Sequence, residues 1–132
     1  MQYMLLIYLE EQALSETERE QCYLDSARFA QELNAKGKYL AAAPLHPTST
    51  ATSVRVQSGK RLVTDGPFAE TREQLGGFFM IEARDLDEAI GIAAGIPAAH
   101  WGTVEIRPVV YVPSLPADLA DRAVDSAPLR ST

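Results

Sequence analysis

The chain has 132 residues, of which 46% are hydrophobic and 23% charged, a composition typical of one globular domain with its own core. The net charge of −6 and the scattered basic residues argue against nucleic-acid binding, which requires clustered lysine and arginine. No apolar run approaches the roughly 20 residues that span a membrane. Cys22 is the single cysteine, and the first residues lack the pattern of a signal peptide, so we expect a cytoplasmic protein.

The first third of the chain predicts a strand, a helix and a second strand. Residues 2–8 are almost continuously apolar, which is typical of a central strand covered on both faces. Ser15 and Glu18 have the spacing of a capping box and predict a helix over residues 16–36. Residues 38–43 are expected to form the next strand.

The middle of the chain alternates valine with polar residues over residues 51–63, on either side of Ser58 and Gly59. This pattern predicts a β-hairpin with a tight turn. A polar loop from Asp65 to Gly77 follows, and the apolar run at residues 78–83 is expected to be a buried strand. A polar connection this long is more often functional than a tight turn is.

The last third predicts a helix that begins at Asp85 and a strand over residues 103–109. The order is β-α-β, an inserted hairpin and β-α-β, which predicts an α+β ferredoxin-like fold with both helices on one face of an antiparallel sheet. A second copy of the chain is the simplest cover for the other face, so we expect a homodimer. Residues 1–112 would form this domain, and residues 113–132 a tail with a short helix at residues 117–123.

The polar loop also carries a family motif. It consists of Asp65, Gly66, Pro67 and Phe68, then Ala69, Glu70 and Thr71, and then residues 73–77. With this motif the chain resembles the DGPF-motif branch of the YCII-related proteins over roughly residues 1–108. The resemblance implies a dimeric α+β barrel of unassigned activity. It also implies a link to extracytoplasmic-function sigma factors, because proteins that carry this motif look like frequent companions of these factors.

The resemblance to the wider YCII family implies a His-Asp pair that its members share. The histidine of this pair lies on the first helix, and the aspartate lies beside a proline after the second helix. Here the first predicted helix contains no histidine, and Ile96 precedes Pro97 where the aspartate would stand. The resemblance therefore implies that this pair is absent and that any chemistry uses other residues.

Asp65 and His100 are the candidate catalytic residues. A loop carboxylate or a histidine at a helix–strand junction is suited to act as a general base. Both have equally ordinary structural interpretations. Asp65 stands before Gly66 and Pro67, where aspartate often forms a turn, and His100 stands beside Trp101, where it would cap a helix or pack.

Five further side chains are candidate ligand-binding residues: His46, Phe68, Glu70, Thr71 and Arg107. His46 lies in a proline-flanked loop that presents it either to a cleft or to solvent. Arg107 would neutralise an anionic ligand or pair with Glu105. Cys22 is expected to belong to the core rather than to act as a nucleophile.

No metal or cofactor is expected, because the two histidines lack the paired spacing of a zinc site and the glycine pair precedes a strand rather than a helix. Three functions stay open. The first is a small lyase, isomerase or dehalogenase, which requires Asp65 and His100 to meet in one cleft near the Asp65 to Gly77 loop. The second is a non-catalytic regulatory or binding partner in sigma-factor signalling, and the third is a purely structural dimer.

Overall fold

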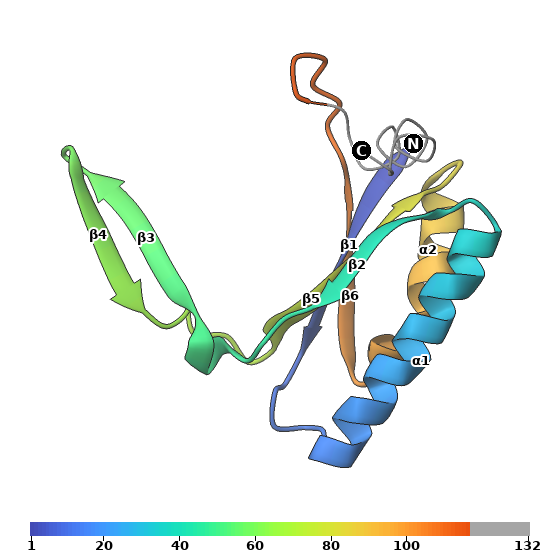
Figure 1. Ribbon diagram of the computed structural model, residues 1–132, viewed down its shortest axis with the longest axis horizontal. Helices are drawn as coiled ribbons and strands as arrows, with labels where there is room; N and C mark the ends of the chain where they lie inside the picture. Colours follow the sequence, from blue (N-terminus) through green and yellow to red (C-terminus); the bar gives the residue numbers. More distant parts are fainter. Residues whose placement is uncertain (117–132) are drawn as a thin grey trace, which may run out of the picture.

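The structure is a computed structural model that describes residues 1–116. Its main sheet is antiparallel with the strand order β2-β5-β1-β6. The elements of this body are β1 (Gln2–Leu9), α1 (Glu16–Ala35), β2 (Tyr39–Pro44), β5 (Gln74–Glu82), α2 (Leu86–Gly95), the short helix η2 (Pro97–His100) and β6 (Gly102–Pro108). Both long helices lie on the same side of the sheet (Figure 1). The predicted ferredoxin-like α+β fold is confirmed.

The insertion between β2 and β5 begins with a short helix, η1 (Thr48–Thr50), and continues as a two-stranded hairpin of β3 (Thr52–Gln57) and β4 (Lys60–Asp65). We call this hairpin the arm. It projects away from the sheet and the helices (Figure 1). Ser58 and Gly59 adopt φ values of 50° and 75°, as the tight turn between the strands requires.

The core lies between the helices and the sheet. Leu5, Ile81 and Ile96 are fully buried, and the rings of Phe29 and Phe79 meet edge to face with 5.9 Å between their centroids. Ile96 occupies the place where the family resemblance implies an aspartate. Its aliphatic side chain is part of the core, so this position offers no group for proton transfer.

The helix starts follow the predicted caps. The Ser15 hydroxyl accepts a hydrogen bond from the Glu18 amide at 3.1 Å, and the Glu18 carboxylate accepts one from the Ser15 amide at 2.8 Å. This capping box satisfies two backbone amides that would otherwise lack partners at the beginning of α1. Asp85 caps α2 by accepting from the Glu88 amide at 2.9 Å.

The polar loop is shorter than the sequence predicted, because β5 already begins at Gln74. Gly76 and Gly77 therefore lie within the strand and not before it. Strand β2 passes so close to Gly77 that a Cβ atom there would lie 2.8 Å from the carbonyl oxygen of Ala43. The glycine permits this close approach of two backbones. We call the remaining connection, residues 66–73, the motif loop.

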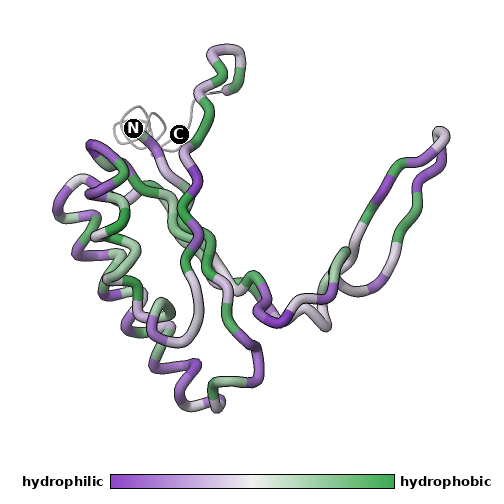
Figure 2. The backbone as a smooth tube through the Cα atoms, turned by 180° about the vertical axis from the view of Figure 1, so that it is seen from behind, coloured by the Kyte–Doolittle hydropathy of each residue, from purple (hydrophilic) through white to green (hydrophobic). Residues whose placement is uncertain are grey.

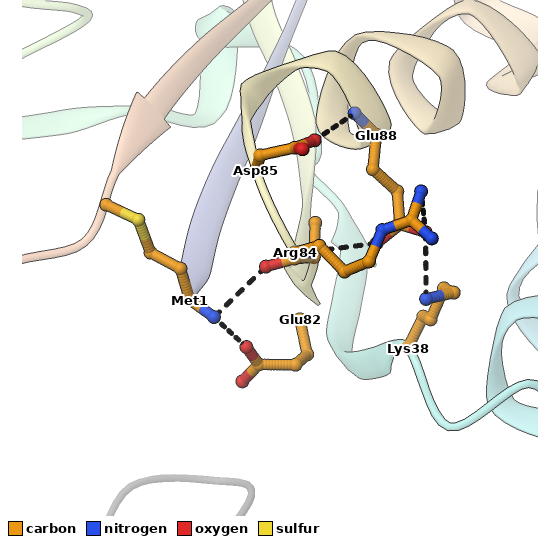
Figure 3. A network of polar contacts seen from close by, with 7 residues as sticks. Met1, Lys38, Glu82, Arg84, Asp85 and Glu88 are labelled. Carbon is orange, nitrogen blue, oxygen red and sulfur yellow. Dashed lines mark hydrogen bonds and ion pairs between the residues drawn. The ribbon is translucent and has the colours of Figure 1, made fainter.

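Polar contacts tie the start of α2 to the neighbouring strand ends (Figure 3). The Glu88 carboxylate accepts a hydrogen bond from the Arg84 amide at 2.8 Å and forms ion pairs with Lys38 at 3.0 Å and with the Arg84 guanidinium at 3.5 Å. These partners hold the pKa of Glu88 below its usual range, with the hydrogen bond from the Arg84 backbone as the largest cause. The amino group of Met1 contacts the Glu82 carboxylate beside this network.

Within residues 1–116, no helix is long and apolar enough to cross a membrane. The short helix predicted at residues 117–123 lies outside the described residues. The boundary between a domain of residues 1–112 and a tail of residues 113–132 stays a prediction.

Candidate functional site

A cleft of about 1080 Å³ opens at the end of the sheet from which the arm projects. Four segments form its walls: the loop after β1, the first half of α1, the loop after β2, and the motif loop with the base of the arm. The walls carry carboxylates, an imidazole, a guanidinium and several apolar side chains. The lining residues include Leu9, Glu11, Arg19, Cys22, His46 and Asp65.

Four of the seven candidate residues line this cleft: His46, Asp65, Glu70 and Thr71. All four are exposed, as expected for a cleft that is open to solvent. The other three, Phe68, His100 and Arg107, do not line it. The structure therefore brings the ligand-binding candidates of two loops together but does not bring His100 to Asp65 within one subunit.

The three candidates outside the cleft have separate surroundings. Phe68 is 87% exposed and so does not hold the motif loop on the core. His100 is an exposed residue at the end of η2. The Arg107 guanidinium lies 4.0 Å from the Glu105 carboxylate, which also accepts a hydrogen bond from the Tyr8 hydroxyl at 3.2 Å. Their predicted roles in catalysis or binding stay predictions.

Asp65 is the last residue of β4, paired in register with Thr52. Its carboxylate makes no hydrogen bond or ion pair with any residue in the described range 1–116, so the turn-forming interaction typical of Asp-Gly-Pro is not formed. The backbone of Gly66 makes the turn instead, with φ of 99°, a hydrogen bond to the Ala51 carbonyl at 2.7 Å and one from the Ser53 hydroxyl at 2.8 Å. The Asp65 carboxylate, which lines the cleft, therefore has no partner among residues 1–116.

Glu11 joins three walls of the cleft. Its carboxylate accepts two hydrogen bonds of 2.7 Å from the amide and the hydroxyl of Thr48. Its amide donates to the Gln74 side chain at 3.1 Å, and its carbonyl accepts from the Arg19 guanidinium at 2.6 Å. Glu11 and Arg19 were not predicted from the sequence, because their partners lie in other segments and no local motif marks them.

The motif loop is tied mainly by its own hydrogen bonds. The Thr71 hydroxyl donates to the Glu73 carbonyl at 2.5 Å, and the Gln74 side chain donates to the Thr71 carbonyl at 2.6 Å. Arg72 contacts Glu10 at 3.1 Å, but this ion pair is exposed and contributes little. The Thr71 hydroxyl thus has a structural partner, whereas the Glu70 side chain has none among the described residues.

A second, apolar pocket of about 320 Å³ adjoins the cleft between α1 and the strands β2 and β5. Small side chains leave this space open: Ser26, Ala27 and Ala30 on the helix, and Ala42, which lies opposite the buried Phe79 on the helix-facing side of β2. The two cavities share four lining residues, namely Leu9, Cys22, Tyr23 and Gly76. They are therefore neighbouring parts of one site; the first has a mixed polar and apolar lining, and the second is mainly apolar.

Cys22 stands at this junction. Its side chain is half-buried and packs against the core, and burial raises the pKa of the thiol, with a further rise from the Asp25 charge. A thiol with a raised pKa is a poor nucleophile at neutral pH. In the part of the chain that the structure describes, no group of three or more His, Cys, Asp or Glu side chains is arranged to hold a metal ion.

Fold and sequence together define the class of this protein as a ferredoxin-like α+β domain with a cleft at one end of the sheet. The chain belongs to the YCII-related family, whose YCII-related domain matches residues 1–113. An uncharacterised protein of Rhizobium meliloti (strain 1021) is 38% identical over 119 residues, which cover 86% of this chain and 96% of that protein. The predicted family is confirmed, and the DGPF branch stays a prediction.

A solved structure with a similar fold is the 5-chloro-2-hydroxyhydroquinone dehydrochlorinase of Burkholderia phenoliruptrix in complex with 2,5-dihydroxybenzoquinone. The superposition has a TM-score of 0.53 and 15% sequence identity, and it covers 85% of this chain and 96% of that enzyme. At this identity the likeness shows a shared fold and does not transfer an activity.

Proposed function

We propose that this chain binds a small molecule with a polar end and an apolar body in the two adjoining cavities. The observation that carries the proposal is their junction at Leu9, Cys22, Tyr23 and Gly76. Ligand pockets in proteins are typically apolar with a few polar groups that fix orientation, and the pair of cavities has this composition. Hydroxylated or carboxylated aromatic compounds combine the two required properties.

The cleft also supports a reaction that needs no cofactor, of the lyase, isomerase or dehalogenase type. Asp65 and His46 are the cleft groups suited to accept a proton from a bound molecule. The Arg19 guanidinium would stabilise negative charge that develops on that molecule. The dehydrochlorinase of similar fold acts on a ring compound of this kind, which makes its bound quinone a reasonable probe.

We further propose that the working form is a cytoplasmic homodimer in which the sheet faces opposite the helices meet. Met4 pairs with Met80 and Leu6 with Phe78 in the β1–β5 ladder, on the side away from the buried Leu5 and Ile81. These four apolar side chains are only half-buried in one subunit. A second subunit would remove them from water, which is favourable.

The binding proposal is tested by titrating the ¹⁵N-labelled protein with a panel of hydroxylated aromatic compounds, beginning with 2,5-dihydroxybenzoquinone. We expect saturable shifts of the amide signals of Gly66, Thr71 and Gly76, which line the cleft. The signals of His100 and Arg107 should stay in place. A panel that shifts none of the cleft amides, or that shifts only distant ones, would contradict the proposal.

Site variants then distinguish the candidate residues that line the cleft from those that do not. Asp65→Asn and His46→Gln should weaken binding about tenfold each, the usual effect of losing one hydrogen bond to a charged or polar group. Phe68→Ala, in the motif loop that follows Asp65, tests the ligand-binding candidate that lies outside the cleft, and we expect it to leave binding unchanged. A loss of turnover in His100→Ala would support the catalytic role predicted for His100, and unchanged turnover would contradict it.

As the alternative we propose a non-catalytic regulatory partner in extracytoplasmic-function sigma factor signalling. The arm and the motif loop, in which no side chain is buried, offer the exposed surface that a protein partner needs. This alternative predicts ligand or protein binding without turnover. It also predicts that the Asp65→Asn and His46→Gln variants keep the partner interaction.

A further inference from the structure

The arm has two chemically different faces. Cross-strand pairing places Val54 opposite Val63 and Val56 opposite Arg61, so these side chains share one face. We call Val54, Val56 and Val63 the valine face. They are 62%, 71% and 59% exposed, respectively. The opposite face carries the alternate residues, including Arg55, Lys60 and Leu62.

Among residues 1–116, nothing covers the valine face. No side chain of β3 or β4 is buried, and hydrophobic stretches run along both strands of the arm, apart from the rest of the chain (Figure 2). A two-stranded hairpin with neither a third strand nor a helix against it is at best marginally stable in water. Three exposed valines on one face of such a hairpin therefore indicate a surface that another molecule covers.

The area that a stable dimer requires points to a second copy of the chain. The open face of the main sheet carries the half-buried apolar side chains of Met4, Leu6, Ala41, Ala43, Phe78 and Met80, together with Leu75, which is 38% exposed. Because most of these side chains are already half-buried, a partner can remove only part of their surface from water, whereas a standard interface buries ~800 Å² per partner. The valines of the arm are more exposed than any of these side chains and add to the apolar surface that a second copy can cover.

The distribution of charge also favours a second copy of the chain as the partner of the arm. The arm carries three basic residues, Arg55, Lys60 and Arg61, and one acidic residue, Asp65, whereas the whole chain has a net charge of −6. The rest of the chain is therefore more acidic than the total suggests. Two acidic bodies repel each other, and a basic arm that reaches onto the second body opposes this repulsion.

We infer that the arm packs its valine face on a second copy of this chain, so that each subunit of the dimer holds the arm of the other. The inference rests on the homodimer proposed above and adds the contact that completes its interface. The arm ends at Asp65 and Gly66, both of which line the cleft. The second subunit thereby fixes the position of one cleft wall, and the site is complete only in the dimer.

The test replaces the valine face with an isosteric polar one. The triple variant Val54→Thr, Val56→Thr, Val63→Thr keeps β-branched side chains and hence the strand preference of the arm. Sedimentation velocity across a dilution series should show a dimer dissociation constant at least tenfold above that of the unmodified chain. Leu62→Thr, on the opposite face, is the matched control and should leave the dissociation constant unchanged.

Each outcome is decisive. A monomeric unmodified chain overturns both the dimer and the arm contact. A dimer that the triple variant forms as tightly as the unmodified chain overturns the arm contact alone. Ligand titration of the cleft is a separate measurement, so failure of the binding proposal is distinguishable from either result.

A second measurement locates the arm directly. A spin label at Gln57→Cys, in a Cys22→Ser background, is mixed with ¹⁵N-labelled chain that carries no spin label. Because Gln57 is the last residue of β3 beside the turn, its label reports where the end of the arm lies. We expect signal broadening on the ¹⁵N-labelled chain in the mixed dimer. A mixed dimer without intermolecular broadening would overturn the inference.

Discussion

Two antiparallel ladders of this molecule have the same hydrogen-bonding scheme and very different surroundings. In the β1–β5 ladder, Leu5 lies opposite Phe79 and Tyr3 opposite Ile81, and these side chains are buried against the helices. In the β3–β4 ladder of the arm, no side chain is buried. The difference shows that alternating β-forming residues specify a ladder, whereas the cover over one face supplies most of its stability.

The cleft lies where these two regions meet. Leu9 and Gln74 reach it from the ends of core strands, and Asp65 reaches it from the base of the arm. One wall is therefore fixed by the hydrophobic core, and the other depends on what holds the arm. Perturbing each region separately shows how far the site depends on either one.

The largest effect is expected for Ile81→Ala, because Ile81 is fully buried in the core. Removing three buried carbons and leaving a cavity should lower the free energy of unfolding by about 2–5 kcal/mol. Urea denaturation followed by circular dichroism measures the change. The arm counterpart is Leu62→Ala, at a 43% exposed position, which should change stability by no more than about 0.5 kcal/mol. Equal losses in the two variants would contradict the contrast between the regions.

A smaller effect is expected where two strands of the body approach closely. In Gly77→Ala the new methyl group would lie 2.8 Å from the Ala43 carbonyl oxygen, so β2 must shift. We expect a loss of about 1–3 kcal/mol, as for other overpacked sites. Gly91→Ala is the control, since nothing lies within 4 Å of the added atom on α2 and the helix should gain about 0.5–1 kcal/mol. A neutral Gly77→Ala would show that β2 relaxes easily.

Features whose partners are close in sequence were predictable. The capping box of Ser15 and Glu18 and the turn at Ser58 and Gly59 were confirmed because a few neighbouring residues determine both. The start of β5 was predicted four residues too late. Glycines usually interrupt strands, and only the approach of β2 explains why Gly77 lies within one.

The candidate site likewise contains residues that local sequence patterns predicted and residues that they did not. His46, Asp65, Glu70 and Thr71 were marked by loop chemistry, and the fold places all four at one cleft. Glu11 and Arg19 were not foreseen, because their roles depend on Thr48 and Gln74 from other segments. A pairing such as that of Asp65 with His100 depends on tertiary distances, which spacing along the chain does not determine.

The next prediction concerns the contact of Glu11 with Thr48, which lies between the main sheet and the arm. Thr48→Val removes a 2.7 Å hydrogen bond to a carboxylate and should cost about 1.5 kcal/mol, the lower end of the range for bonds to charged groups, because the Thr48 amide still donates to Glu11. Thr64→Val on the exposed arm is the matched control, with a change below about 0.5 kcal/mol. The amide signals of Glu11 and Gln74 should move only in the first variant. Unchanged signals would mean that the Thr48 hydroxyl does not hold this wall.

The smallest effect is expected from the charge network at α2. Because its pKa is lower in the folded state than its ordinary value of 4.5, Glu88 contributes stability that is present above that value and is lost as the pH falls toward the folded pKa. Glu88→Gln should therefore lower the urea midpoint slightly at pH 7 and should flatten its decline between about pH 5 and pH 3. Lys60→Gln is the control in the arm, because Lys60 forms no ion pair within residues 1–116. An acid dependence that Glu88→Gln leaves unchanged would show that the contacts with Lys38 and Arg84 do not couple this carboxylate to folding.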